Sequence, residues 1–127
     1  MIHNDMDTFH GRLKKLIHEY VRLIYALAKK FPFNELYGMT SQLRRATLSV
    51  MLNYIEGFAR KRPAVKLNFF EISYGSFKES KYLILLAFEE GYISQHEYQK
   101  ANLYAEEIGA MLWRTIEAIE QTDIQNR

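Results

Sequence analysis

Apolar residues recur at steps of three and four along most of the chain, which is the spacing of an α-helix with one buried face. Alternation with a period of two, the mark of a half-buried strand, is sustained nowhere. The pattern predicts four helices, over about residues 9–30, 35–61, 64–90 and 95–120. It therefore predicts an all-α protein.

Proline, glycine and capping residues set the predicted helix ends. Pro32 ends the first helix, because proline disfavours helical backbone at the residue before it. The second helix begins after Asn34 or after Thr40, since both are suitable N-caps. Pro63 suits the first turn of the third helix, and Gly91 suits the position just past its end.

A capping box formed by Ser94 and Glu97 marks the start of the fourth helix, and residues 122–127 are expected to fray. The chain has 127 residues, the usual length of one domain. Four long helices joined by short connections predict a single domain over residues 1–127, an antiparallel up-and-down four-helix bundle.

The second helix has a wider apolar surface than one bundle requires. On a helical wheel its polar residues fall within about 80° of arc, and only Arg44 interrupts the rest. A core-facing stripe spans a little over 100°, so a second face of similar width remains. We expect another copy of the chain to cover this face, through Leu48, Met51, Leu52 and Ile55.

The third helix carries a stripe of small residues, namely Ser73, Ser76, Ser80 and Ala87. Small side chains let helix backbones approach closely, either inside a bundle or between subunits. Its remaining surface is largely apolar, which favours self-association. The alternative is an unusually well-buried central helix within a monomer.

Charge is unevenly distributed although the net charge is only +2. Residues 37–68 hold six Lys and Arg against one acid, whereas residues 69–98 hold two against five and residues 99–127 three against five. This asymmetry indicates an anionic partner or self-association of oppositely charged faces. Ordinary solvated helix faces are the alternative.

Two groups of polar residues are candidate functional sites. One is a polar stripe of the second helix, which Glu79 could join, made of Arg45, Ser49, Asn53, Glu56 and Arg60. It either sets helix register or contacts a ligand. The other is a set of cations suited to a phosphate backbone, made of Arg44, Arg45, Arg60, Lys61, Arg62 and Lys66.

Motifs for catalysis and for metal or cofactor binding are missing. Cysteine is absent, and none of the four histidines has metal-ligand spacing. No nucleophile elbow and no glycine-rich phosphate loop occurs. We therefore expect no enzyme activity, no metal and no cofactor. The longest apolar run is too short to span a bilayer, and residues 1–7 do not resemble a leader, so a soluble cytoplasmic protein without membrane contact is expected.

The second helix also carries a family resemblance. The relevant segments are residues 37–46 (YGMTSQLRRA), Ser49-Val50 and residues 53–60 (NYIEGFAR). They resemble the signature of four-helix-bundle proteins encoded in intervening sequences of bacterial 23S rRNA genes, roughly G-L-T-S-Q-L-R-R-A-x-x-S-I-x-x-N-I-A-E-G-x-x-R. The resemblance covers about residues 9–120. Met51 and Leu52 depart from it, because the family often has proline or a small residue there.

This resemblance implies a ring-like homopentamer and an association with RNA. A more distant similarity is to accessory proteins of diversity-generating retroelements, which are pentameric bundles that bind a reverse transcriptase and nucleic acid. We therefore expect a non-enzymatic, self-assembling bundle that binds structured RNA through its basic residues. The alternatives are an adaptor for a protein such as a reverse transcriptase and a purely structural oligomer.

Overall fold

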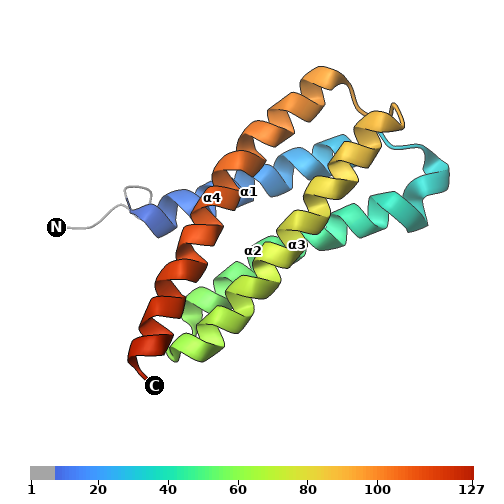
Figure 1. Cartoon of the computed structure of the whole chain (residues 1–127). Coiled ribbons are helices and arrows are strands. Elements are labelled where there is room, and N and C mark those ends of the chain that lie inside the picture. Colours follow the sequence, from blue (N-terminus) through green and yellow to red (C-terminus); the bar gives the residue numbers. More distant parts are fainter. Residues whose placement is uncertain (1–7) are drawn as a thin grey trace.

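The structure is a computed structural model that describes residues 8–127, and this part of the chain is a bundle of four α-helices without strands (Figure 1). The helices are α1 (Phe9–Ala28), α2 (Ser41–Ala59), α3 (Pro63–Glu89) and α4 (Gln95–Gln125). The all-α prediction is therefore confirmed. None of the described helices is long and apolar enough to cross a membrane. The expectation about a leader concerns residues 1–7, which lie outside the described residues.

Local sequence explains where most helices begin and end. The Thr8 hydroxyl accepts a hydrogen bond from the Gly11 amide (2.9 Å) at the start of α1. Gly91 has a φ of 79° just past the end of α3, a conformation that glycine adopts without strain. The predicted capping box opens α4, with the Glu97 amide donating to the Ser94 hydroxyl (3.1 Å) and the Ser94 amide donating to the Glu97 carboxylate (2.9 Å).

Two predicted boundaries differ from the structure. The α-helical part of the second helix begins at Ser41 rather than near residue 35, because a 3-10 turn (Phe33–Glu35) and a π-type turn (Leu36–Thr40) precede it. Gly38 lies in this segment with non-helical φ and ψ of −106° and −107°. At the other end of the chain α4 continues to Gln125 instead of fraying after residue 121. No glycine or proline follows to stop it, and Arg127 pairs with Asp123 one turn earlier (3.1 Å).

Each of the four helices contributes one stripe of buried side chains to a common core. The largest fully buried side chains include Tyr20 from α1, Tyr54 from α2, and Phe70 and Phe77 from α3. The Tyr20 hydroxyl is hydrogen-bonded to the Ser80 hydroxyl (2.8 Å), which satisfies a polar group that would otherwise be costly to bury. Burial of these side chains positions α1 against α2 and α3.

The most extensive helix contact joins α2 and α3. The Ser73 hydroxyl donates to the Val50 carbonyl oxygen (2.6 Å), so the two backbones lie very close together. Gly57 makes the same approach possible further along, since a Cβ there would lie 2.7 Å from the Phe70 ring. Ser73, Ser80 and Ala87 are all buried within the chain. Three of the four residues of the small-residue stripe therefore serve packing inside the bundle.

Candidate self-association and nucleic-acid interfaces

The face of α2 that points away from the core is apolar and exposed. Leu52, Ile55 and Leu48 leave 57%, 42% and 40% of their surface in contact with solvent, whereas Met51 is half-buried against the core. On the opposite side of the same helix Val50 is completely buried. The second apolar face expected from the wheel therefore exists. We define the outer face of α2 as Leu48, Leu52 and Ile55.

The polar stripe of α2 separates into two local groups. The Asn53 amide nitrogen donates to the Ser49 hydroxyl (2.9 Å) and to the Ser49 carbonyl oxygen (3.0 Å), and the Ser49 hydroxyl is bonded to that of Ser76 (2.7 Å). Arg60 pairs with Glu56 (2.6 Å) one turn away. The first group, Ser49 with Asn53 and Ser76, bridges α2 and α3. This position suits a role in setting the register between the two helices.

Arg45 and Glu79 do not join either group. Both side chains are exposed, and neither makes a hydrogen bond or an ion pair within residues 8–127. The expectation that Glu79 joins the network is wrong, because Ser76, one turn before it on α3, occupies the position that faces Ser49. Ser76 thus completes the bridge between α2 and α3.

Two of the six predicted nucleic-acid-binding cations are engaged by their own chain. The Arg60 guanidinium pairs with Glu56 and lies 5.2 Å from the centre of the Phe69 ring. The Lys66 ammonium donates to the carbonyl oxygens of Gly57 (3.2 Å) and Phe58 (3.0 Å). Lys66 therefore caps the last turn of α2, where free carbonyl groups and the negative end of the helix dipole favour a cation.

The other four predicted cations lie in two separate places. Lys61 and Arg62 are exposed at the corner between α2 and α3, without an ion pair to residues 8–127. Arg44 and Arg45 lie near the start of α2, about 25 Å away at 1.5 Å of rise per residue. The Arg44 guanidinium stacks over Tyr25 at 5.5 Å, and its Nε is buried without a partner among the described residues. The six predicted cations therefore do not form one continuous patch.

Helix α1 is a basic surface that the sequence analysis missed. Residues 9–30 hold six Lys and Arg against the single acid Glu19. Lys14, Arg22 and Lys29 are exposed and make no ion pair within residues 8–127. A charge count over the predicted helix would have found this surface. A count over the wider window 1–36 conceals it, because that window also contains Asp5, Asp7 and Glu35.

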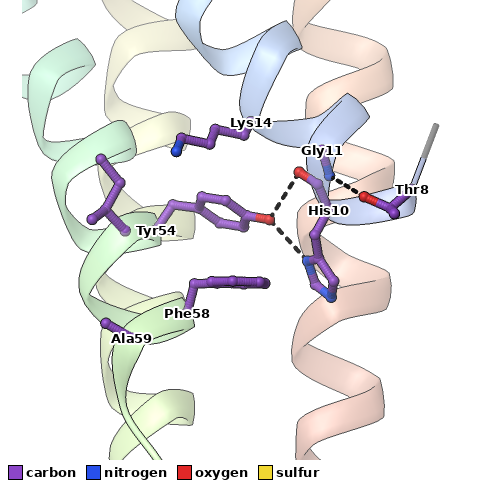
Figure 2. A pocket seen from close by; sticks show the side chains of 8 residues that line it. Thr8, His10, Gly11, Lys14, Tyr54, Phe58 and Ala59 are labelled. Atoms are coloured by element: carbon purple, nitrogen blue, oxygen red, sulfur yellow. Dashed lines mark hydrogen bonds between the residues drawn. The ribbon is translucent and has the colours of Figure 1, made fainter. Parts of the chain in front are cut away.

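A pocket of about 250 Å³ lies between the start of α1 and the end of α2 (Figure 2). On its floor the Tyr54 hydroxyl bonds the Nδ1 of His10 (2.8 Å), and the Phe58 ring lies 5.2 Å from the His10 ring. Burial, and then the nearby charge of Lys66, lowers the pKa of His10. Burial raises the pKa of Tyr54. The Tyr54 hydroxyl also donates to the His10 carbonyl oxygen (3.4 Å), so it is hydrogen-bonded to both the ring and the backbone of His10.

Comparison with known proteins places this arrangement in a family. Within residues 8–127 no group of three or more His, Asp or Glu side chains is arranged to hold a metal ion. A comparison with curated proteins finds no significant match. A similar solved structure is that of a protein of unknown function from the S23 ribosomal protein family of Bacteroides thetaiotaomicron VPI-5482, 25% identical with a TM-score of 0.74, and the match covers 82% of this chain and 97% of that one. Residues 12–114 match the 23S rRNA-intervening sequence protein family, and the chain belongs to that family.

Proposed function

We propose that the protein is a non-enzymatic, cytoplasmic, antiparallel up-and-down bundle that assembles into a ring of identical subunits and binds structured RNA. The outer face of α2 is the observation that carries the proposal. Its three large aliphatic side chains are 40–57% exposed and adjacent on one helix surface. A contiguous apolar surface of this kind is typical of a protein interface.

Charge distribution supports a second copy as the partner. Helix α1 and residues 37–68 carry an excess of cations, whereas residues 69–127, which include α3 beyond its first turns and α4, carry an excess of acids. A basic surface of one copy therefore complements an acidic surface of the next. Such a contact joins two different surfaces, and repeating it closes a ring when the rotation between subunits allows.

RNA binding is supported by the cations that the fold leaves available. Lys61 and Arg62 are exposed at the corner between α2 and α3. Lys14 lies at the same end of the bundle, because it lines the pocket together with Ala59 at the end of α2. One subunit offers few phosphate contacts, so we expect a single chain to bind weakly. A ring repeats the group once per subunit and raises the effective concentration of binding sites.

Self-assembly is tested by the mass of the protein in solution. Light scattering after size exclusion should give a mass several times 15.1 kDa, and five times that value for the pentamer that the family implies. Leu52→Glu should reduce the mass to that of one chain, because a carboxylate would be buried without a partner. Ala26→Glu adds the same charge at an exposed position of α1 and should leave the mass unchanged. A parent protein that stays monomeric at high micromolar concentration would contradict assembly.

RNA binding is tested by reversing the free charges of the corner. Lys61→Glu combined with Arg62→Glu should remove most binding to a structured RNA and leave the mass unchanged. In the parent, the logarithm of the binding constant should fall with that of salt concentration with a slope of about −0.7 to −0.9 per phosphate contact. The control is Lys78→Glu combined with Lys100→Glu, an equal charge change at exposed positions of α3 and α4. Equal loss of binding in both double variants would contradict a site at the corner.

An adaptor role is the second candidate, favoured by two large exposed apolar residues on α4. Leu103 and Trp113 leave 75% and 50% of their surface exposed, on a different helix from the outer face of α2. A reverse transcriptase would be a protein partner of this class. Absence of RNA binding at low salt, together with binding of a purified reverse transcriptase that Trp113→Arg abolishes, would favour this role. If neither partner binds, a purely structural oligomer remains.

A further inference from the structure

The pocket between α1 and α2 combines an apolar interior with one available cation. Tyr54, which is almost completely buried, forms the floor, and Phe58, Ile55 and Ala59 supply apolar walls from α2. Lys14 reaches from α1 across the opposite side of the Tyr54 ring from Phe58 (Figure 2). We propose that this pocket binds a small aromatic carboxylate, with its ring against Phe58 and its carboxylate on the Lys14 ammonium.

The polar groups of the pocket favour an anion over a neutral ligand or a cation. Among residues 8–127, Lys14 makes no ion pair and no acidic side chain lines the pocket. Lys66 adds a second positive charge nearby, with its ammonium 5.8 Å from the centre of the Phe58 ring. Both carbonyl oxygens that Lys66 contacts belong to the end of α2, so Lys14 is the cation left to bind a ligand directly.

Size limits the ligand to about one ring. An apolar protein cavity of about 150 Å³ holds benzene, so a pocket of about 250 Å³ has room for a ring with a carboxylate attached. Pockets that hold larger, drug-sized ligands usually measure about 300–1,000 Å³. A nucleotide therefore fits this pocket less well than a monocyclic acid. Phe58 is 56% exposed, so its ring is available for contact with an aromatic ligand.

The hydrogen bond between His10 and Tyr54 holds the floor rigid. Tyr54 is bonded to the Nδ1 of His10, and its ring packs 5.7 Å from that of Phe70 in the core. Both polar groups of the floor are thus satisfied without a ligand, and specificity for the anion rests on Lys14. A carboxylate on an ammonium forms a charge-assisted hydrogen bond, which is stronger than a neutral one.

Isothermal titration of the full chain with benzoate and with benzyl alcohol tests the proposal. The two probes share a ring of the same size and differ in charge. Benzoate should bind saturably, and benzyl alcohol should bind about tenfold more weakly. This ratio corresponds to the lower end of the range for a hydrogen bond to a charged group, because Lys14 is exposed. Equal affinity for the two probes, or no saturable binding of benzoate, would overturn the proposal.

Adjacent lysines of α1 provide a matched pair of variants. Lys14→Gln should weaken benzoate binding about tenfold and leave benzyl alcohol binding unchanged. Lys15→Gln should change neither, because Lys15 lies outside the pocket and faces Glu19 (3.9 Å). Ala59→Leu fills the pocket at an exposed position and should abolish binding of both probes while the helical circular dichroism stays unchanged. Equal effects of the two lysine variants would overturn the proposal.

The site adjoins the outer face of α2 through Ile55, and Lys14 also belongs to the proposed RNA-binding group. The same variants separate ligand binding from these two properties. Lys14→Gln should leave the mass in solution unchanged, since the ligand rather than a neighbouring copy occupies the pocket. If Lys14→Gln lowers the mass and benzoate does not bind, an acidic side chain of a second copy fills the pocket and the proposal is wrong. Failure of the parent to bind RNA would leave the benzoate result unaffected.

Discussion

Helix α2 has two apolar faces, of which one is buried in the core and the other is exposed to solvent. The inner face, with Val50, Tyr54 and Gly57, is buried against α3 and α1. The outer face, with Leu48, Leu52 and Ile55, remains in contact with solvent. The residues named on the exposed face are the more apolar ones, so side-chain hydrophobicity alone does not determine which face enters the core.

The difference lies in the size of the side chains and in what they meet. Gly57 on α2 and Ser73 on α3 let the two backbones approach closely, and the Phe70 ring fills the space beside Gly57. The large aliphatic residues of the outer face have no such counterpart within residues 8–127. Small residues thus mark the face that packs within one chain, whereas large exposed side chains mark a face that a partner can cover.

The inner face should be the more sensitive to added volume. Gly57→Ala should lower the free energy of unfolding by about 1–3 kcal/mol, because the new methyl group would lie 2.7 Å from a Phe70 ring that is itself buried. Gly75→Ala is the matched control, since no atom lies within 4 Å of a Cβ there. It should raise stability by about 0.5–1 kcal/mol, the advantage of alanine within a helix. Urea unfolding of both variants checks the difference.

The outer face should contribute to stability only through association. The denaturation midpoint of the parent should rise with protein concentration, because the partner copy binds only the folded state. Each tenfold increase in protein concentration should add about 1.4 kcal/mol to the free energy of unfolding. Leu52→Ser should remove this dependence and leave the stability at low concentration nearly unchanged. A midpoint of the parent that is constant over a hundredfold range of concentration would show that the two faces do not differ in this way.

Hydroxyl groups provide a finer comparison between the centre of the α2–α3 contact and its edge. Ser73→Ala removes a buried hydrogen bond to the Val50 carbonyl and should cost about 1 kcal/mol. Ser49→Ala removes half-buried hydrogen bonds to Ser76 and Asn53, and should cost less because water can replace them at the edge. Thermal unfolding of the two variants shows which of them loses more stability. A larger loss for Ser49→Ala would place the register-setting contact at the edge.

The smallest effect is expected at the exposed ion pair of the polar stripe. Glu56→Ala should lower stability by only about 0.3–0.5 kcal/mol, because both side chains of the Glu56–Arg60 pair are about half exposed. The pair should also weaken further in salt. A loss above 1 kcal/mol would indicate that a partner covers this edge in solution.

Most of the fold could be predicted because it depends on local signals. Hydrophobic spacing located the four helices, and the capping box and Gly91 located two of the ends. For the start of α2 the sequence left two caps open, and the structure has the one at Thr40, because two consecutive turns of irregular helix follow Pro32 and precede Ser41. The candidate cations were predicted as one group, but residue type does not reveal that Lys66 caps α2 or that Arg60 is paired.

The sequence by itself determined the helices, the width of the apolar surface on α2 and the family, because each depends on residue order along the chain. Only the tertiary structure decided which of two similar faces is buried, which cations are free, and that His10 and Tyr54 meet beside Lys14 in a pocket. These properties depend on contacts between residues far apart in the sequence, such as His10 and Tyr54, which are 44 positions apart. Such contacts follow from how whole helices pack, which no local pattern specifies.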